Sequence, residues 1–158
     1  MGVGKSSVAR HLSQILGSDR IDLDAAIEEA VGRTIAELMD LEGEASFRKV
    51  ETDILKQILN GTKPGILSLG GGTWTLPENR VLIKSNGYTV IWLESNFDHC
   101  WINIKFSRKD RPLGRNKEET RKLFDDRQRH YCLADWHFVV RPDHTSYEVA
   151  RQIAEQLP

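Results

Sequence analysis

The sequence predicts an α/β fold, a three-layer sandwich in which a parallel sheet lies between two layers of helices. Short apolar runs alternate along the chain with stretches that have helical periodicity. There are four such runs, and the last three are mostly apolar, which is typical of parallel strands covered on both faces. Strands that alternate with helices are joined by right-handed crossovers, which place helices on both sides of the sheet. A chain of 158 residues has room for one such domain, so we expect a single domain over residues 1–158.

Each expected element follows from its own pattern. The runs expected to form strands are residues 20–23, 65–69, 88–93 and 136–140. Apolar residues at helical spacing predict helices between them: Val8, Leu12, Ile15 and Leu16; Phe47, Val50, Ile54 and Ile58; and, behind Ser146, Val149, Ile153 and Leu157. We expect the second helix to end at Asn60-Gly61, because glycine commonly ends helices.

Composition excludes several classes of protein. The chain has 22 Lys and Arg against 23 Asp and Glu, so no overall field attracts nucleic acid or an anionic membrane. No apolar run reaches the roughly 18 residues of a spanning helix, and no apolar signal segment opens the sequence. Cys100 and Cys132 have no metal-ligand spacing, and we expect both to be buried thiols in a reducing compartment. The sequence thus predicts a cytoplasmic domain that binds neither nucleic acid nor a membrane.

The segment from Lys105 to Lys122 departs from this alternation. It holds eight Lys or Arg against three acidic residues, together with Pro112 and Gly114. One interpretation is a solvated charged loop, and the other is a mobile basic lid, about residues 105–118, over an anionic ligand. Nucleic-acid binding is the weaker interpretation, because Phe106 is the only aromatic residue among these charges.

The chain opens with the second half of the G-x-x-x-x-G-K-[ST] phosphate loop, in the residues Gly2, Val3, Gly4, Lys5, Ser6 and Ser7. Glycine lets the backbone adopt positive φ and turn its N–H groups toward phosphate oxygens, and the following helix adds the positive end of its dipole. Lys5 supplies a charge for the β- and γ-phosphates, and the Ser6 hydroxyl suits Mg²⁺. These residues predict a nucleotide site.

The first half of the motif is missing. Its glycine falls three residues before Gly2, after an apolar strand, whereas the sequence begins at Met1. We expect that strand to lie inside the sheet, so its loss leaves unpaired strand edges and an apolar hole. The cost is comparable with the entire free energy of unfolding of a domain, about 5–15 kcal/mol. We therefore expect Met1 to be a truncated start. The alternative is that this length is native, folds weakly and binds ATP weakly.

Two further motifs follow strands. Asp22-Leu23-Asp24 ends the first visible strand, where alternation places both carboxylates on one face, one suited to Mg²⁺ and one to a substrate hydroxyl. The alternative is that Asp24 only caps the helix starting at Ala25. Gly70-Gly71-Gly72 follows the second strand, at the end where open α/β sheets bind ligands. The alternative interpretation of this glycine triplet is an ordinary flexible loop.

Taken in order, the motifs resemble the shikimate kinase family over nearly the whole chain. They are Gly4-Lys5-Ser6-Ser7, Ile21-Asp22-Leu23-Asp24, the stretches Gly32–Leu38 and Glu42–Arg48, Leu69-Gly70-Gly71-Gly72, Arg111-Pro112-Leu113, and Arg127 with Tyr131 four residues later. The resemblance implies a P-loop NTPase fold with a parallel five-stranded sheet and a small lid. It also implies a monomer that uses ATP and Mg²⁺ to phosphorylate the 3-hydroxyl of shikimate, in aromatic amino-acid biosynthesis.

The resemblance also implies site residues. Lys5, Asp24 and Arg111 would be catalytic, and Ser6 and Asp22 would hold Mg²⁺. The loop from Gly2 to Ser7 and Arg111 would bind ATP. Shikimate would contact Asp24, Arg48, Gly70, Gly71, Gly72 and Arg127, the two arginines as guanidinium forks on its carboxylate. Read without the resemblance, Arg48 pairs with Glu44 or Glu51, and Arg127 with Asp126.

Two other functions stay open. Another small-molecule P-loop kinase, such as one of the gluconate kinase type, would not need two carboxylate-binding arginines together with the other motifs. A shikimate-kinase-like domain that only binds would be expected to lack residues such as Lys5 and Asp24, which are present. The chain also departs from the family in the lid, where Gly114 follows Arg111-Pro112-Leu113 instead of the usual leucine, so we expect the lid to pack differently.

Overall fold

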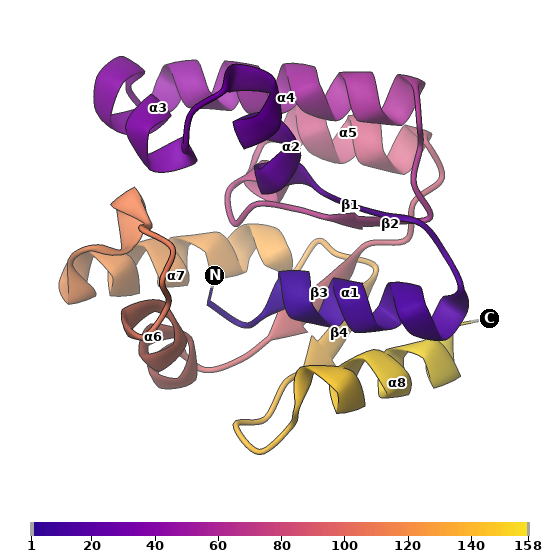
Figure 1. Cartoon of the computed structure of the whole chain (residues 1–158). Coiled ribbons are helices and arrows are strands. Elements are labelled where there is room, and N and C mark those ends of the chain that lie inside the picture. Colours follow the sequence, from indigo (N-terminus) through magenta and orange to yellow (C-terminus); the bar gives the residue numbers. More distant parts are fainter. Residues whose placement is uncertain (1, 158) are drawn as a thin grey trace.

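The computed structural model describes residues 2–157 and places helices on both sides of short parallel strands (Figure 1). The helices are α1 (Lys5–Leu16), α2 (Leu23–Val31), α3 (Ile35–Glu42), α4 (Glu44–Asn60), α5 (Pro77–Ser85), α6 (Phe97–Lys105), α7 (Lys117–Tyr131) and α8 (Ser146–Gln156). The strands are β1 (Arg20–Asp22), β2 (Ile66–Ser68), β3 (Ile91–Glu94) and β4 (Trp136–Val139). Single 3₁₀ turns span Thr73–Thr75 and Pro112–Gly114. The α/β prediction is confirmed.

The four expected strands are present, but their bounds differ from those predicted. The first ends at Asp22 rather than at residue 23, because the Asp22 carboxylate accepts a hydrogen bond from the Ala25 amide (3.2 Å) and starts α2. The third begins at Ile91 rather than at residue 88, where the Tyr88 hydroxyl instead donates to the carbonyl of Pro64. The second helix ends before Gly61, as predicted.

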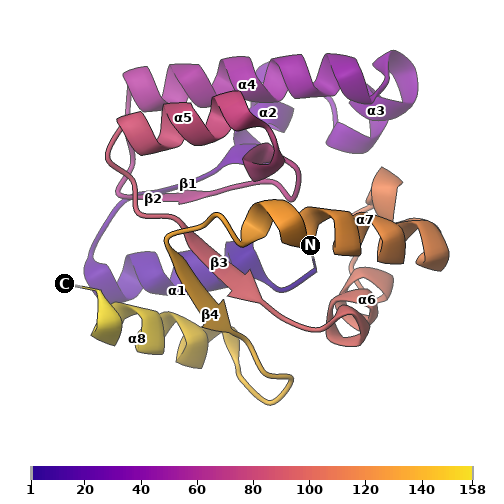
Figure 2. The same ribbon diagram turned by 180° about the vertical axis from the view of Figure 1, so that it is seen from behind.

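The strands form two separate parallel pairs instead of one sheet (Figure 2). β1 lies beside β2, with Asp22 opposite Ser68, and β3 lies beside β4, with Ile91 opposite Trp136. Within residues 2–157, no strand joins β2 to β3. The predicted single sheet is therefore divided, and the expected unpaired strand edges are present at this division. Met1 lies outside the described residues.

Two apolar clusters form the core, one on each side of the strands. The first packs α2, α4 and α5 and includes Leu23, Ile27 and Leu55, and the second packs α1 against α8. Ile15 and Leu16 belong to the apolar spacing that predicted α1, but they lie outside the core, since they are 38% and 45% exposed. Both lie in the last turn of α1, and Leu16 borders the gap between the strand pairs, where nothing covers it.

The cysteines divide between core and surface. Cys100 is buried in α6, and burial raises the pKa of its thiol. Cys132 is exposed, contrary to prediction, because it follows the last residue of α7. Of the helices within the described residues, none has the length and apolarity that a membrane crossing requires.

Candidate active site

The phosphate loop enters α1 through two glycines with positive φ. Gly2 has φ +69° and Gly4 has φ +91°, and Gly4 is the N-cap of α1. A Cβ atom on Gly2 would lie 2.5 Å from the carbonyl oxygen of Cys100, so only glycine fits against α6 there. The Asn103 amide of α6 donates to the Gly2 carbonyl (2.8 Å). Helix α6 thus holds the loop at the N-terminus of α1.

The loop and the first strand meet through one short hydrogen bond. The Ser6 hydroxyl donates to Asp22 Oδ2 at 2.6 Å, and Asp22 Oδ1 accepts from the Ala25 amide. Asp22 is therefore the cap of α2, and the interpretation of Asp24 as that cap is wrong. The prediction that both carboxylates lie on one face of a strand is also wrong, because Asp24 belongs to the first turn of α2. Even so, both residues line the same cleft.

One cleft of about 280 Å³ collects the sequence-predicted site residues from distant parts of the chain. They come from the phosphate loop, the carboxyl ends of β1 and β2, helices α2, α4 and α7, and the lid segment (residues 105–118) (Figure 1). The lining includes Gly2, Gly4, Lys5, Ser6, Ser7, Asp22, Asp24, Arg48, Gly70, Gly71, Gly72, Arg111 and Arg127. Val3 is the exception, because its side chain is buried in the core cluster between α1 and α8.

The carboxyl group of Asp24 is perturbed by its surroundings. Burial raises its pKa, and Lys109, whose Nζ lies 4.0 Å from Asp24 Oδ2, opposes that rise. Lys109 also lies 3.7 Å from Glu28. Lys109 is not among the site residues predicted from the sequence. Its membership of the basic segment was the available signal, but only the fold shows which carboxylates it reaches.

Arg48 is held by two carboxylates of its own helix. Its Nη1 donates to Glu51 (2.8 Å) and its Nη2 to Glu44 (3.1 Å), so both alternative pairings are present, and Arg48 lines the cleft as well. Burial disfavours its charge, yet these two carboxylates raise its pKa on balance. Glu51 is fully buried and also accepts from Thr73 (2.7 Å). Glu51 was predicted only as an alternative partner of Arg48 and not as a site residue, although its position three residues after Arg48 was a signal.

Arg127 approaches the cleft from α7, and its side chain is buried. It hydrogen-bonds the hydroxyl of Tyr131, whose own proton goes to the carbonyl of Gly71 (2.5 Å). Burial raises the pKa of Tyr131, so the hydroxyl keeps that proton. This chain of contacts fastens α7 to the glycine triplet.

The glycine triplet gives three functional side chains room beside its backbone. A Cβ on Gly70 would lie 2.8 Å from Asp24 Oδ1, and one on Gly71 would lie 2.5 Å from Arg127 Nη1. A Cβ on Gly72 would overlap the guanidinium of Arg48. The triplet is therefore a close-approach surface, which the flexible-loop interpretation does not explain.

For the two substrates that the sequence resemblance implies, we expect Gly72→Ala to raise the KM for shikimate by about tenfold or more, or ~1.4 kcal/mol, and to change the KM for ATP by less than about threefold. The new methyl group displaces the Arg48 guanidinium, which the buried Glu51 otherwise holds in place. Steady-state kinetics with each substrate varied would measure this. Gly61→Ala is the control, because it also crowds backbone (3.0 Å from the Gln57 carbonyl) but lies at the far end of α4. Equal losses in both variants would contradict the explanation.

The lid segment brings a second cation to the phosphate loop. Burial lowers the pKa of Lys5, Asp24 opposes this shift, and Arg111 adds to it. Within the described residues, the Nε atom of Arg111 is buried and has no hydrogen-bond partner. Two cations that face one cleft, one of them with an unused buried donor, suit a polyphosphate.

Gly114 explains how this lid segment packs. It is buried, and a Cβ there would lie 3.2 Å from Ile104 of α6, so a larger residue would push the lid segment away. Arg115 bonds Asp110 and reaches Asp40 of α3 (3.0 Å), although both ion pairs are exposed and contribute little. Gly114 therefore lets the lid segment lie close to α6.

A phosphate loop at the start of α1, an Mg²⁺-compatible hydroxyl–carboxylate pair and converging cations, set in an α/β fold, define the chain as a P-loop phosphotransferase. The family model described as shikimate kinase matches residues 1–158. The chain belongs to the shikimate kinase family, whose members are ATP-dependent and use Mg²⁺. This membership removes the gluconate kinase alternative.

Individual proteins agree with this assignment. A shikimate kinase of Streptococcus thermophilus is 42% identical over 158 residues, covering 97% of this chain and 93% of that protein. A shikimate kinase of Histophilus somni is 41% identical over 127 residues, covering 80% of this chain and 70% of that protein. The solved shikimate kinase of Acinetobacter baumannii in complex with shikimate superposes with a TM-score of 0.89 at 29% identity, covering 98% of this chain and 87% of that one. The solved shikimate kinase of Aquifex aeolicus superposes with a TM-score of 0.79 at 30% identity, covering 97% of this chain and 89% of that one.

Proposed function

We propose that this cleft transfers the γ-phosphate of ATP to the 3-hydroxyl of shikimate, and that its residues divide into nucleotide, substrate and transfer groups. The observation that carries the proposal is that one cleft joins the phosphate loop to a carboxylate pair and to two arginines from separate helices. A phosphate loop alone fits any nucleotide-dependent enzyme. The two arginines add a site for a carboxylate on the acceptor, and shikimate carries one.

The nucleotide group surrounds the start of α1. The N–H groups of the loop and the helix dipole would bind the phosphates, and Lys5 and Arg111 would neutralise their charge. Ser6 and Asp22 fit an Mg²⁺ ion, because they offer the hydroxyl and carboxylate oxygens that this ion prefers, 2.6 Å apart. The bound ion would supply charge neutralisation on the phosphate oxygens.

The substrate group faces the loop from α2, α4 and α7. Arg48 and Arg127 would hold the shikimate carboxylate with their guanidinium groups, Arg48 positioned by Glu51 and Arg127 by Tyr131. The glycine triplet leaves room for both and presents its backbone to the ring. Asp24 would accept the hydrogen bond of the 3-hydroxyl and so orient its oxygen toward the γ-phosphorus.

Transfer then requires one bond to form and one to break. The 3-hydroxyl oxygen bonds the γ-phosphorus while the bond from that phosphorus to the β,γ-bridging oxygen breaks, and ADP leaves with the electron pair. Asp24 takes the hydroxyl proton, and its raised pKa makes it a better acceptor than an ordinary carboxylate. Lys5 and Arg111 stabilise the charge that spreads over the transferring group.

An ADP-release assay on the 158-residue chain, run with and without shikimate, tests the proposal. We expect ADP release that depends on shikimate. A folded chain that binds ATP and shikimate without releasing ADP would instead support a domain that only binds.

The acid limb of the pH profile of kcat/KM should report the ionisation of the Asp24 carboxyl group. The reaction needs the carboxylate, and burial raises its pKa above the ordinary value of 3.8, so kcat/KM should begin to fall at a pH above that value. Lys109 favours the charged form, so Lys109→Ala should move this limb to higher pH. Lys122→Ala, which removes an exposed lysine of α7, is the control and should leave the limb in place. An unmoved limb in Lys109→Ala would contradict this assignment of Asp24.

We also propose that the enzyme works as a monomer on small molecules in the cytoplasm. The proposed groups of the cleft all come from one chain, and the free cysteines suit a reducing compartment. Light scattering behind size-exclusion chromatography would test the monomer, and a dimer at micromolar concentration would contradict it.

A further inference from the structure

The hydroxyl of Thr73 lies behind the arginine that α4 presents to the cleft. Thr73 follows the glycine triplet, in the single 3₁₀ turn Thr73–Thr75, and it is fully buried. Its hydroxyl donates to Glu51 Oε2 at 2.7 Å, and Oε1 of the same carboxylate accepts from Arg48 Nη1 at 2.8 Å. Arg48 and Glu51 both line the cleft. Glu51 therefore connects Thr73, in the interior, to Arg48 in the site.

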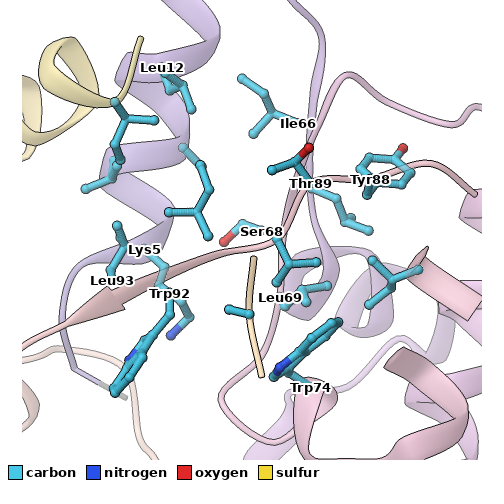
Figure 3. A pocket seen from close by; sticks show the side chains of 18 of the residues that line it. Lys5, Leu12, Ile66, Ser68, Leu69, Trp74, Tyr88, Thr89, Trp92 and Leu93 are labelled. Atoms are coloured by element: carbon cyan, nitrogen blue, oxygen red, sulfur yellow. The ribbon is translucent and has the colours of Figure 1, made fainter. Parts of the chain in front are cut away.

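Contacts with three other parts of the fold fix the backbone of this turn. The Thr73 amide donates to the Gly70 carbonyl (3.3 Å), and the Thr73 carbonyl accepts from the side-chain amide of Asn79 in α5 (3.1 Å). The next residue, Trp74, donates from its ring to the His130 carbonyl of α7 (3.1 Å), and this ring lies beside the gap between the two strand pairs (Figure 3). The Thr73 hydroxyl therefore projects from a backbone held by the glycine triplet, α5 and α7.

The hydrogen bond from Thr73 limits how Glu51 can pair with Arg48. A carboxylate can accept two parallel N–H groups from one guanidinium, with one oxygen for each. Here one oxygen of Glu51 accepts from Thr73 and the other accepts from Arg48. Arg48 Nη2 reaches Glu44 instead (3.1 Å), and the guanidinium lies against Gly72 at the wall of the cleft. Because a guanidinium has five N–H groups, these contacts leave donors for a ligand in the cleft.

We propose that Thr73 is a positioning residue for recognition of the acceptor's carboxylate, because its hydrogen bond to Glu51 keeps the guanidinium of Arg48 turned toward the cleft. Without the hydroxyl, a buried carboxylate oxygen loses its donor, which is costly for a charged group. Arg48 already contacts the other oxygen, so its guanidinium would close onto Glu51 with two hydrogen bonds and turn away from the ligand. This inference rests on the proposed binding of the shikimate carboxylate by Arg48.

The test compares Thr73→Val, which replaces the hydroxyl by a methyl group of similar size, with Thr73→Ser, which keeps the hydroxyl. We expect Thr73→Val to raise both the KM and the dissociation constant for shikimate by about tenfold, and Thr73→Ser to stay within about threefold of wild type. In both variants, kcat and the KM for ATP should change by less than about threefold, because the phosphate loop and Asp24 are untouched. Steady-state kinetics gives the KM values, and calorimetry gives the dissociation constant.

A substrate that lacks the carboxylate charge separates the positioning of Arg48 from a general disturbance of the site. The methyl ester of shikimate keeps the ring and the 3-hydroxyl but offers Arg48 no anionic group. Thr73→Val should therefore lower kcat/KM by about tenfold for shikimate and by less than about threefold for the ester. Losses of equal size with the two substrates would overturn the proposal.

Thr52→Val is the control for the loss of a buried hydrogen bond in this part of the fold. Thr52 is buried as well, and its hydroxyl donates to Asn79 Oδ1 (3.0 Å) and not to Glu51. Both valine variants should lower the urea midpoint, and only Thr73→Val should weaken the binding of shikimate. Equal weakening in the two, or equally weak binding by Thr73→Ser, would overturn the proposal. If Thr73→Val does not fold, Thr73→Ala replaces it, because alanine and serine differ in the hydroxyl alone.

The outcomes also distinguish this inference from the proposed function. Turnover of shikimate by the wild type, with an unchanged KM in Thr73→Val, would overturn the role of Thr73 alone. Binding of shikimate by the wild type without turnover would overturn the transfer reaction, and the dissociation constants would still test Thr73. A folded wild type that does not bind shikimate would overturn both, because Arg48 would have no carboxylate to hold.

Discussion

Replacing Asp24 by asparagine should lower kcat by about 1000-fold or more, within the contribution of about 10²–10⁴ that a general base makes. The amide has the same shape and still meets the substrate hydroxyl, but it neither carries the charge nor accepts the proton. The affinity for ATP should change by less than about threefold, because Lys5, Ser6 and the loop backbone are untouched. The ADP-release assay gives kcat, and titration of the nucleotide against the folded variant gives its affinity.

The same variant should be at least as stable as the wild type. Burial raises the pKa of Asp24 in the folded chain, so the folded state binds its proton more tightly than the unfolded state does. Stability from this group is therefore present below pH 3.8 and is lost as pH rises through the raised pKa, which leaves an ionised carboxylate that costs stability at neutral pH. Asparagine removes that cost, and a urea concentration at the midpoint of unfolding that is equal to or higher than that of the wild type would show it.

Asp53→Asn, at an exposed position of α4, is the matched control for the effect of Asp24→Asn on activity. Activity of Asp24→Asn within tenfold of wild type would exclude the proposed role.

Arg127→Ala should raise the KM for shikimate by about 100-fold, since a charge-assisted pair contributes roughly 1.5–3 kcal/mol. The KM for ATP should stay within about threefold. Arg127 is buried and adjoins Gly71, so its loss leaves a cavity where the substrate carboxylate would bind. Steady-state kinetics with each substrate varied in turn measures the difference.

Two further variants separate recognition from packing. Arg127→Lys keeps the charge and much of the volume but loses the fork, so it should recover only part of the affinity. Arg129→Ala lies on the same helix at an exposed position and should behave as wild type. Parallel losses of affinity for both substrates in Arg127→Ala would indicate a disturbed α7 and would count against a carboxylate clamp.

Much of the candidate site was predictable because its chemistry is local in sequence. The phosphate loop from Gly2 to Ser7 needs its residues in a fixed order, and so does the glycine triplet at the end of a strand. The α/β class followed from alternation of apolar runs, which reflects burial of strands on both faces. The exact ends of strands were less predictable, because a capping bond such as that of Asp22 stops a strand that propensity alone would continue.

Contacts between distant segments were not predictable in the same way. Lys109 meets Asp24 only because the lid segment folds over α2, and nothing in the spacing of these residues indicates it. Arg48 was open to interpretation as a structural ion pair or a ligand, and the structure shows that Glu51 holds it while it lines the cleft. Leu16 belongs to the apolar spacing that predicted α1, yet it is exposed, because the gap between the strand pairs lies open beside it.

The sequence by itself determined the class of fold, the phosphate loop and the order of the motifs, since each depends on short-range geometry or on apolar periodicity. Only the tertiary structure decided which side chains share the cleft, which carboxylates position Arg48, and where the pKa of Asp24 lies relative to its ordinary value. It also decided that the strands form two pairs with a slot between them. The physical reason is that burial, electrostatic coupling and strand pairing depend on distances through space, which separation along the chain does not set.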